Sequence, residues 1–205
     1  SADRDWLEKV HLENENGLVS LSLAFVAAAR LEKQRGRPDK AVPYGLDLLQ
    51  LANATSQGGL VLDRLVAGGI HYRAIHTLLV LSDQLPREDC LKLLTNVRTT
   101  PLVLELPEVV YQREAALFRR INGTWRNLMM TGVIRAQRQA SLLQMKKAEQ
   151  LHAVMNALLQ THLALRIYQI DHQQFPKKLD QLVQRHLLEK LRDQLVEQVP
   201  LDQFS

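Results

Sequence analysis

The chain has 205 residues, of which 46% are hydrophobic, 5% aromatic and 23% charged. This length is enough for one sizeable core, and the scarcity of aromatic residues favours helices over sheets, in which aromatic and β-branched residues are enriched. The net charge of +4 is too small to imply a nucleic-acid partner. A single cysteine excludes an internal disulfide, and no stretch approaches about 20 apolar residues without a charge, as a membrane span would.

The N-terminal part of the chain predicts one long helix over residues 6–34. Apolar residues recur in it at spacings of three and four, which indicates one buried face, and a break is expected at residues 14–17. The expected buried face consists of Leu18, Leu21, Phe25, Ala28 and Leu31. Gly36, Pro38 and Pro43 should end this helix, because glycine favours helix ends and proline cannot continue a helix.

Three further helices are predicted over residues 44–53, about 60–85 and 86–97. The third has Pro86 at its start and acidic residues in its first turn, where the helix dipole favours them. Gly68 and Gly69 weaken the second helix by on the order of 1 kcal/mol each, so we expect them to admit a close neighbouring helix.

The second half of the chain continues the helical pattern. Residues 102–106 are too short and isolated for a sheet and should link to a helix over 107–121, followed by a turn at 122–125 and more helix to about residue 145. The last long helix, over 146–170, carries two apolar stripes, so we expect it to be buried on two sides. One stripe contains Leu151, Met155, Leu158 and Leu165, and the other contains Leu159, Leu163, Ile167 and Ile170.

A polar segment then leads to Phe175 and Pro176. A residue before proline favours extended geometry, and proline suits the first turn of a helix. We therefore expect Tyr168 to close against Phe175, and a final helix that starts at Pro176 to carry Leu179 on its apolar face.

The sequence ALRIYQIDHQQFPKKLDQLV followed by VPLDQFS resembles a known module, roughly A-L-x-x-Y-x-x-D-x-G-x-Y-P-x-x-L followed by P-x-D-P-F-S. The structural positions of this module are Tyr168, Asp171, Phe175, Pro176 and Leu179. It is similar to a segment that follows the long helix of type II secretion pseudopilins, and to the end of uncharacterised, membrane-anchored helical proteins of planctomycete-type bacteria. The resemblance to the second group covers roughly residues 46–205.

Three residues depart from the module: Gln173 and Gln174 stand where it has glycine, and Gln203 stands where it has proline. The apolar N-terminal helix of a pseudopilin is not seen, so pilus assembly is not implied. The resemblance implies an extracytoplasmic or periplasmic protein whose membrane anchor was removed before Ser1. It implies no activity.

These elements predict a single all-α domain over residues 1–205 with no substantial sheet. We expect about eight helices in an irregular helical bundle or a TPR-like helix-hairpin array. Residues 1–145 would form the helix-hairpin region, and residues 146–205 would form the long helix with its Phe-Pro module.

One alternative function is a di-metal, ferritin-like helical enzyme. Two Glu-x-x-His pairs each place a carboxylate and an imidazole on one helix face, and such sites add glutamates from other helices. The candidate ligands are Glu8, His11, Glu149, His152 and Glu114, with Glu105 as a further candidate. The helices do not match in length as a bundle requires, so we favour chance occurrence and expect no metal and no cofactor.

A second alternative is a binder of polyanions or of an anionic membrane surface through residues 113–147. The basic residues of this stretch include Arg113, Arg119, Arg120, Arg126, Arg135 and Arg138. Such a strip could contact phosphates or headgroups. We favour a solvated face, or one paired with the acidic start of the chain.

No pattern in the sequence predicts a catalytic centre. No G-x-S-x-G, P-loop or G-x-G-x-x-G motif occurs. His71 and His76 are five residues apart and so point in different directions on a helix. Cys90 follows two acidic residues, which should raise the pKa of its thiol.

The sequence therefore predicts a non-enzymatic, extracytoplasmic helical scaffold or protein-interaction domain. Its partner would be a protein that the sequence does not identify, it would not bind nucleic acid, and a removed anchor would place it near a membrane.

Overall fold

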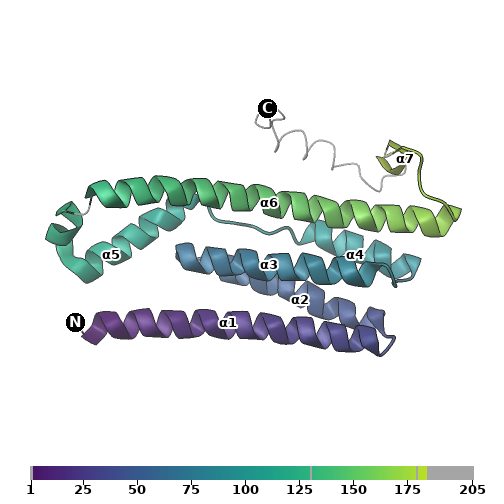
Figure 1. Ribbon diagram of the computed structural model, residues 1–205, viewed down its shortest axis with the longest axis horizontal. Coiled ribbons are helices and arrows are strands. Elements are labelled where there is room, and N and C mark those ends of the chain that lie inside the picture. Colours follow the sequence, from purple (N-terminus) through teal and green to yellow (C-terminus); the bar gives the residue numbers. More distant parts are fainter. Residues whose placement is uncertain (1, 130, 179, 184–205) are drawn as a thin grey trace.

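The protein is helical along nearly all of its described length, as the computed structural model shows (Figure 1). The structure describes the backbone of residues 2–129, 131–178 and 180–183, and the side chains of residues 13–117, 119–120, 142–178 and 181–182. The helices are α1 (Ala2–Gln34), α2 (Pro38–Ser56), α3 (Val61–Ser82), α4 (Arg87–Thr99), α5 (Pro107–Met129), α6 (Thr131–His172) and α7 (Asp180–Val183). The described residues contain no strand, so the predicted all-α class is confirmed.

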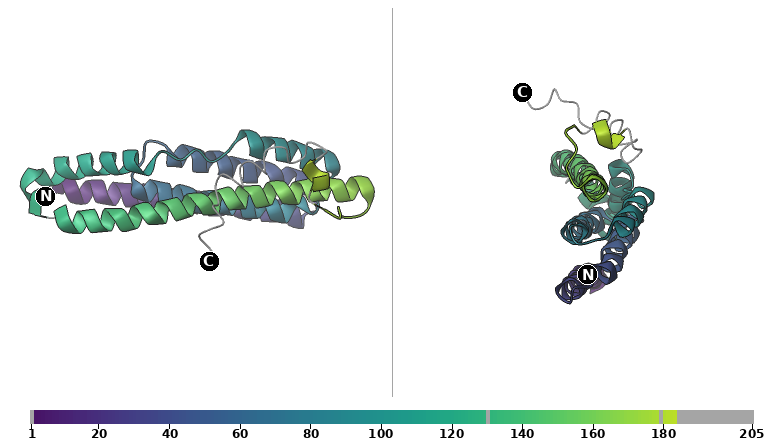
Figure 2. Two further views of the ribbon diagram at one scale, coloured as in Figure 1. Left: turned by 90° about the horizontal axis from the view of Figure 1, so that it is seen from above. Right: turned by 90° about the vertical axis from the view of Figure 1, so that its right-hand side faces the viewer.

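The helices form an elongated body in which successive long helices run in opposite directions. Helices α1, α2 and α3 lie side by side, and α6 lies along α3 and α4 on the opposite side from α1 (Figure 1). The end-on view shows the helices stacked from α1 to α6 across the body (Figure 2). Helix α3 is central, because it contacts α1, α2, α5 and α6.

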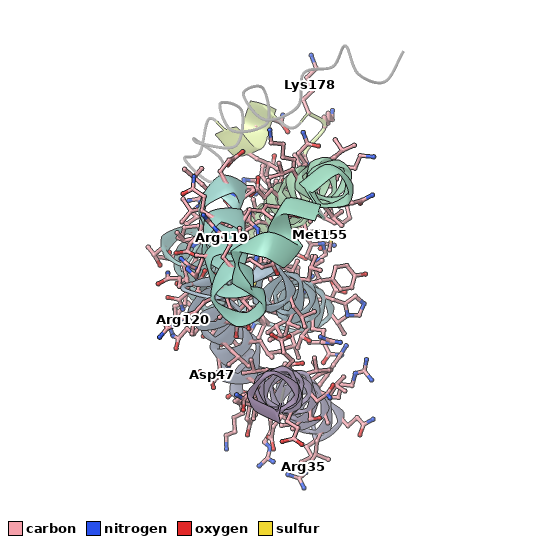
Figure 3. The ribbon with its side chains drawn as sticks, turned by 90° about the vertical axis from the view of Figure 1, so that its left-hand side faces the viewer. Arg35, Asp47, Arg119, Arg120, Met155 and Lys178 are labelled. Carbon is pink, nitrogen blue, oxygen red and sulfur yellow. The ribbon has the colours of Figure 1, made fainter. Side chains whose placement is uncertain are left out.

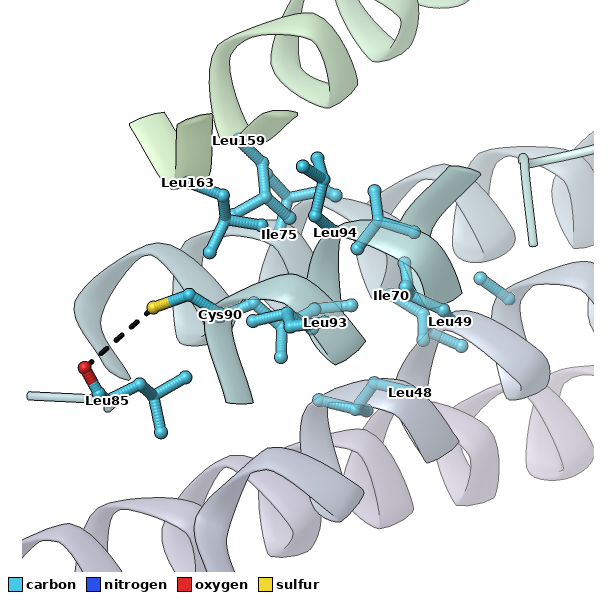
Figure 4. Close-up of a cluster of buried hydrophobic side chains, with 14 of the residues drawn as sticks. Leu48, Leu49, Ile70, Ile75, Leu85, Cys90, Leu93, Leu94, Leu159 and Leu163 are labelled. Carbon is cyan, nitrogen blue, oxygen red and sulfur yellow. Dashed lines mark hydrogen bonds between the residues drawn. The ribbon is translucent and has the colours of Figure 1, made fainter. Parts of the chain in front are cut away.

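The main core forms where α2, α3, α4 and α6 meet (Figure 4). Its fully buried side chains include Leu48, Leu49, Ile70, Ile75, Leu78, Leu93, Leu159 and Leu163. Close contact between α2 and α3 depends on Gly45, because a Cβ atom there would lie 2.5 Å from Leu78 Cδ2. Leucine and isoleucine supply most of the volume, as expected for helix-on-helix packing.

Helix α1 differs from its prediction in two ways. It continues through residues 14–17 without a break, and its buried face includes Ser22 and Ala29, whereas Leu21 and Leu31 are each nearly half exposed. The predicted stripe is therefore confirmed at Leu18 and Phe25, which pack against the core, and wrong at Leu21 and Leu31. Helix α1 lies at the edge of the body, so only one narrow face is covered, and the Ser22 hydroxyl can enter that face because it donates to Val19 O within the helix.

The connection from α1 to α2 is shorter than predicted. Gly36 ends α1 in the left-handed region, at φ +72°, as expected for a glycine helix terminator. Helix α2 then begins at Pro38 and includes Pro43, which the sequence placed outside a helix. Pro43 is exposed and close to the start of α2, so only one hydrogen bond to an early carbonyl is lost.

The region from residue 107 to 172 contains fewer breaks than predicted. The expected linker at 102–106 is confirmed, but the expected turn at 122–125 is wrong because α5 continues through it to Met129. Helix α6 has 42 residues and runs across the expected division between residues 145 and 146.

The Phe-Pro module is packed differently from its prediction. Phe175 is 62% exposed and does not close against Tyr168, whose ring stacks instead on His172, with centroids 4.1 Å apart. Pro176 precedes α7 by four residues and does not begin it. The covered side chain is Leu182 of α7, which packs on α6, whereas Leu179 lies outside the described residues.

Two polar residues of the module fix the end of α6. The carboxylate of Asp171 accepts a 2.5 Å hydrogen bond from Arg87 Nε at the start of α4. Gln173 adopts φ +55° and its N–H bonds to Gln169 O, which is the left-handed helix terminus that glycine favours. This is one of the two positions at which the similar module has glycine.

Among the described helices, α3 alone has the length and hydropathy that a membrane crossing requires. More than half of its apolar window is buried against other helices, so its composition fits its place as the central core helix.

Candidate functional site

An extended segment, residues 101–106, lies between α4 and α5 without strand partners. Two α2 side chains bond to its backbone in place of a sheet. Asn53 donates through Nδ2 to Pro101 O at 3.1 Å and accepts from Val103 N at 2.9 Å, and Ser56 donates to Val103 O at 2.9 Å. These bonds satisfy an isolated backbone and hold the segment in one position beside α6.

A buried arginine of α3 joins this segment to α6. Arg64 is 5% exposed and donates both to the backbone oxygen of Glu105 and to the carboxylate of Glu149. Burial lowers the pKa of Arg64, while the charge of Glu105 opposes that shift. Since Glu149 neutralises it, Arg64 can remain charged inside the protein.

A second arginine fastens the same segment from α5. Arg113 forms a two-bond ion pair with the carboxylate of Glu105, at 2.8 and 2.9 Å, and also donates to Gly59 O. Its hydrogen bonds hold the pKa of Glu105 below the usual range. The segment is therefore clamped from three helices.

Two histidines meet beside Arg64, at the crossing of α3 and α6. The rings of His71 and His152 are 5.1 Å apart and perpendicular. Gly68 makes room for this contact, because a Cβ atom there would lie 2.7 Å from His152 Nε2. The predicted close approach is thus confirmed for Gly68, whereas Gly69 has only its own helix's Arg73 nearby.

Burial keeps both imidazoles neutral. His71 is 2% exposed, and burial together with the neighbouring His152 lowers the pKa of His71 to about 4. Burial and the charge of Arg64 also lower the pKa of His152. His71 Nδ1 is buried and has no hydrogen-bond partner among the described residues.

A cavity of about 630 Å³ opens between α6 and residues 101–107, with His71 and His152 among its lining residues. The segment contributes apolar residues, including Leu102 and Leu104, and α6 contributes both small apolar and polar residues. A smaller cavity of about 260 Å³ shares Leu104 and His152 with it. A volume of this size is within the range of small-molecule sites.

The predicted metal ligands whose side chains the structure describes do not form a common site. Glu149 is paired with Arg64, and His152 faces His71. Burial raises the pKa of Glu114, and a hydrogen bond from the backbone N–H of Val61 opposes this rise. The side chains of Glu8 and His11 lie outside the described residues. Within the described residues, no three His, Cys, Asp or Glu side chains are grouped as a metal ion requires.

The predicted basic face is divided. Arg113 is half-buried and forms an ion pair with Glu105, whereas Arg119 and Arg120 are exposed on α5 (Figure 3). The side chains of the remaining candidates, Arg126, Arg135 and Arg138, lie outside the described residues.

Cys90 is a buried core thiol with a raised pKa, as predicted. Burial raises that pKa to about 11 and contributes more than the neighbouring acids that the sequence suggested, while Arg166 opposes the shift. Its Sγ donates weakly to Leu85 O at 3.8 Å (Figure 4). His76 is exposed and His71 buried, so these two residues lie on different faces of α3.

A buried acid of α1 lies beside the acid at the start of α3. Glu15 is 5% exposed and lies beside Asp63, and burial first and then this neighbour raise the pKa of Glu15 to about 8. Asp63 caps α3 by accepting a 2.5 Å hydrogen bond from Leu60 N.

Sequence reasoning missed the role of Arg64 and of His71 as a buried residue. Both stand in the buried register of α3, which also includes Ala67, Ile75 and Leu78. The available signal was a charged residue seven positions before a histidine, both on the apolar face of a core helix.

Comparisons with family models, curated proteins and solved structures found no match to this chain.

Proposed function

We propose that this chain is a non-enzymatic, helical protein-interaction domain that binds a helix of a partner protein along α6. The support comes from the two apolar stripes of that helix. Leu159 and Leu163 are covered by α3 and α4, whereas the other side of α6 leaves large apolar side chains in solvent. This exposed set, the outer stripe, consists of Leu143, Leu151, Val154 and Leu158, which are 43–55% exposed.

The outer stripe is continuous with a contact that α6 already makes to a helix. Leu182 of α7 is fully buried against Ala164, with Ala157, Leu165 and Tyr168 around it. At 100° per residue, Ala157 and Leu165 share a side of α6 with the outer stripe. A partner helix would extend this contact toward residue 143 by inserting leucine-type side chains at spacings of three and four.

Charge favours a partner with acidic flanks. Lys146 and Lys147 are both exposed beside the outer stripe. Acidic residues on a partner helix would increase its association rate with this face and set its orientation.

The wider proposal is an array of about eight helices, TPR-like in that its hairpins stack, which works outside the cytoplasm after removal of a membrane anchor. The antiparallel succession of α1, α2 and α3 supports the array, and the resemblance of the Phe-Pro module supports the location. The di-metal and polyanion alternatives have less support, because Glu149 and Arg113 are each engaged in an internal ion pair.

The test is a photo-cross-linking residue at Val154, introduced in the cells that make this protein. We expect one partner protein to be cross-linked, and expect the double variant Leu151→Asp/Leu158→Asp to lose it. The matched control is the double variant Leu23→Asp/Leu31→Asp on α1, because Leu23 and Leu31 are 52% and 46% exposed and the same two charges are added.

The control variant should keep the partner, and both proteins should melt cooperatively. Equal cross-linking in the double variant would contradict the proposal. Cross-linking only to a second copy of this chain, with a dimer in sedimentation, would replace the partner protein by self-association.

A further inference from the structure

We infer that the cavity between α6 and residues 101–107 binds a small amphipathic acid, with its carboxylate beside Lys146, its apolar chain along the 101–107 segment and a hydroxyl group at His71. This site is separate from the helix-binding function proposed above, although Val154 borders both. The inference combines a preformed cavity, a lining lysine without an ion pair to any described side chain, and a buried His71 nitrogen without a hydrogen-bond partner in the described part of the chain.

The apolar part of the ligand follows from the cavity walls. Leu102 and Leu104 form one side, and Ala153 and Ala157 of α6 form the other. Small side chains on α6 leave the space, and leucines on the segment provide an apolar surface. Because side chains of α2, α3 and α5 hold the segment by hydrogen bonds, the space exists before a ligand arrives. Preorganisation lowers the entropic cost of binding.

The acidic group follows from the charges around the cavity. Glu149 lines the cavity, but its charge is matched by Arg64. Lys146 also lines the cavity and has no ion pair with any described side chain. Among the described side chains that line the cavity, one uncompensated positive charge therefore remains, and it favours a monoanion over a neutral or cationic ligand.

The hydroxyl group follows from His71. Its Nδ1 is buried without a partner among the described residues, which is costly for a polar atom unless a ligand or water bonds to it. The low pKa of His71 keeps the imidazole neutral, so it can donate or accept one hydrogen bond with a hydroxyl. His71 contacts His152, whose backbone lies about 9 Å along the axis of α6 from that of Lys146.

The experiment is isothermal titration of the purified protein at pH 7.5 with decanoate, decanol, decylamine and ω-hydroxydecanoate. We expect one decanoate per chain, at least tenfold weaker binding of decanol and decylamine, and several-fold tighter binding of ω-hydroxydecanoate than of decanoate.

Lys146 and Lys147 provide a matched pair of variants, because both are exposed lysines on α6 but only Lys146 lines the cavity. Lys146→Gln should weaken decanoate binding about tenfold, which is about 1.4 kcal/mol. Lys147→Gln should leave it unchanged. Ala153→Leu should abolish binding of all four compounds by filling the space.

Equal weakening in both lysine variants, or decanol binding as tightly as decanoate, would overturn the acid site. No heat with any of the four compounds would overturn the cavity as a ligand site. The gain from the hydroxyl should disappear in His71→Gln; if that variant does not fold, a ring-proton shift of His71 in NMR spectra with ω-hydroxydecanoate but not decanoate provides the same test.

Discussion

The part of α6 that lies over α3 makes different interactions at its two ends. Toward α4, Leu159, Leu163 and Ile167 are fully buried in a dry core. Toward α5, the same face carries Glu149 and His152, which meet a buried arginine and histidine of α3 beside a cavity. The end toward α4 anchors the helix by apolar packing. The end toward α5 carries the polar groups and borders the cavity.

This difference gives the polar end a cost that the dry end must offset. Burial of the Arg64 guanidinium carries a desolvation penalty that opposes its attraction to Glu149, whose side chain is 36% exposed, and a cavity forfeits van der Waals contacts. An ion pair and a cavity beside a well-packed core are the arrangement that we expect of a binding site supported by a rigid scaffold.

Leu163→Ala should produce the largest loss, at about 3 kcal/mol of unfolding free energy. The side chain is fully buried at the dry end, and its removal leaves a cavity that rigid neighbours cannot fill. Urea melts followed by circular dichroism would measure the loss. Leu151→Ala on the same helix is the control and should change stability by less than about 0.5 kcal/mol, because Leu151 is 53% exposed. A similar loss in both variants would contradict the assignment of one covered and one exposed stripe.

Acid should weaken the polar end through His71. Its folded-state pKa of about 4 lies below the ordinary histidine value of 6.5, so the folded protein binds fewer protons than the unfolded chain, and stability is lost as pH falls below 6.5. Between pH 7.5 and pH 5 this amounts to about 2 kcal/mol. Urea melts at both pH values should show a smaller loss in His71→Gln than in the unaltered protein.

The variant is needed because Glu15 changes stability in the opposite direction. Its folded-state pKa is raised to about 8, so its contribution is present below pH 4.5 and is lost as pH rises toward 8. Glu15 is unchanged in His71→Gln, so the difference between the two proteins isolates the histidine. An identical pH dependence in both would mean that His71 is accessible to water.

Phe175→Ala should have the smallest effect, below about 0.5 kcal/mol, because the ring is 62% exposed. Leu182→Ala should cost about 2 kcal/mol or more, because that side chain is fully buried on α6. Thermal or urea melts of the two variants would rank them. A larger loss of stability in Phe175→Ala than in Leu182→Ala would support the contact between Tyr168 and Phe175 that the sequence predicted.

Part of the candidate site could be predicted from the sequence. The close helix approach at Gly68, the linker at residues 102–106 and the core stripe of Leu159 and Leu163 depend on local spacing and glycine content, which one segment contains by itself. The pairing of Arg64 with Glu149 could not be predicted in the same way. These residues are 85 positions apart, and only the docking of α6 on α3 brings them together.

The sequence by itself determined that this protein is made of helices and where most of their apolar side chains lie, because helical periodicity is a property of neighbouring residues. Only the tertiary structure decided which stripes are covered, that residues 14–17 and 122–125 stay helical, and that Phe175 stays in water. The physical reason is that burial depends on which helices pack together. A stripe such as Leu151 and Leu158 has the same pattern whether or not another helix covers it.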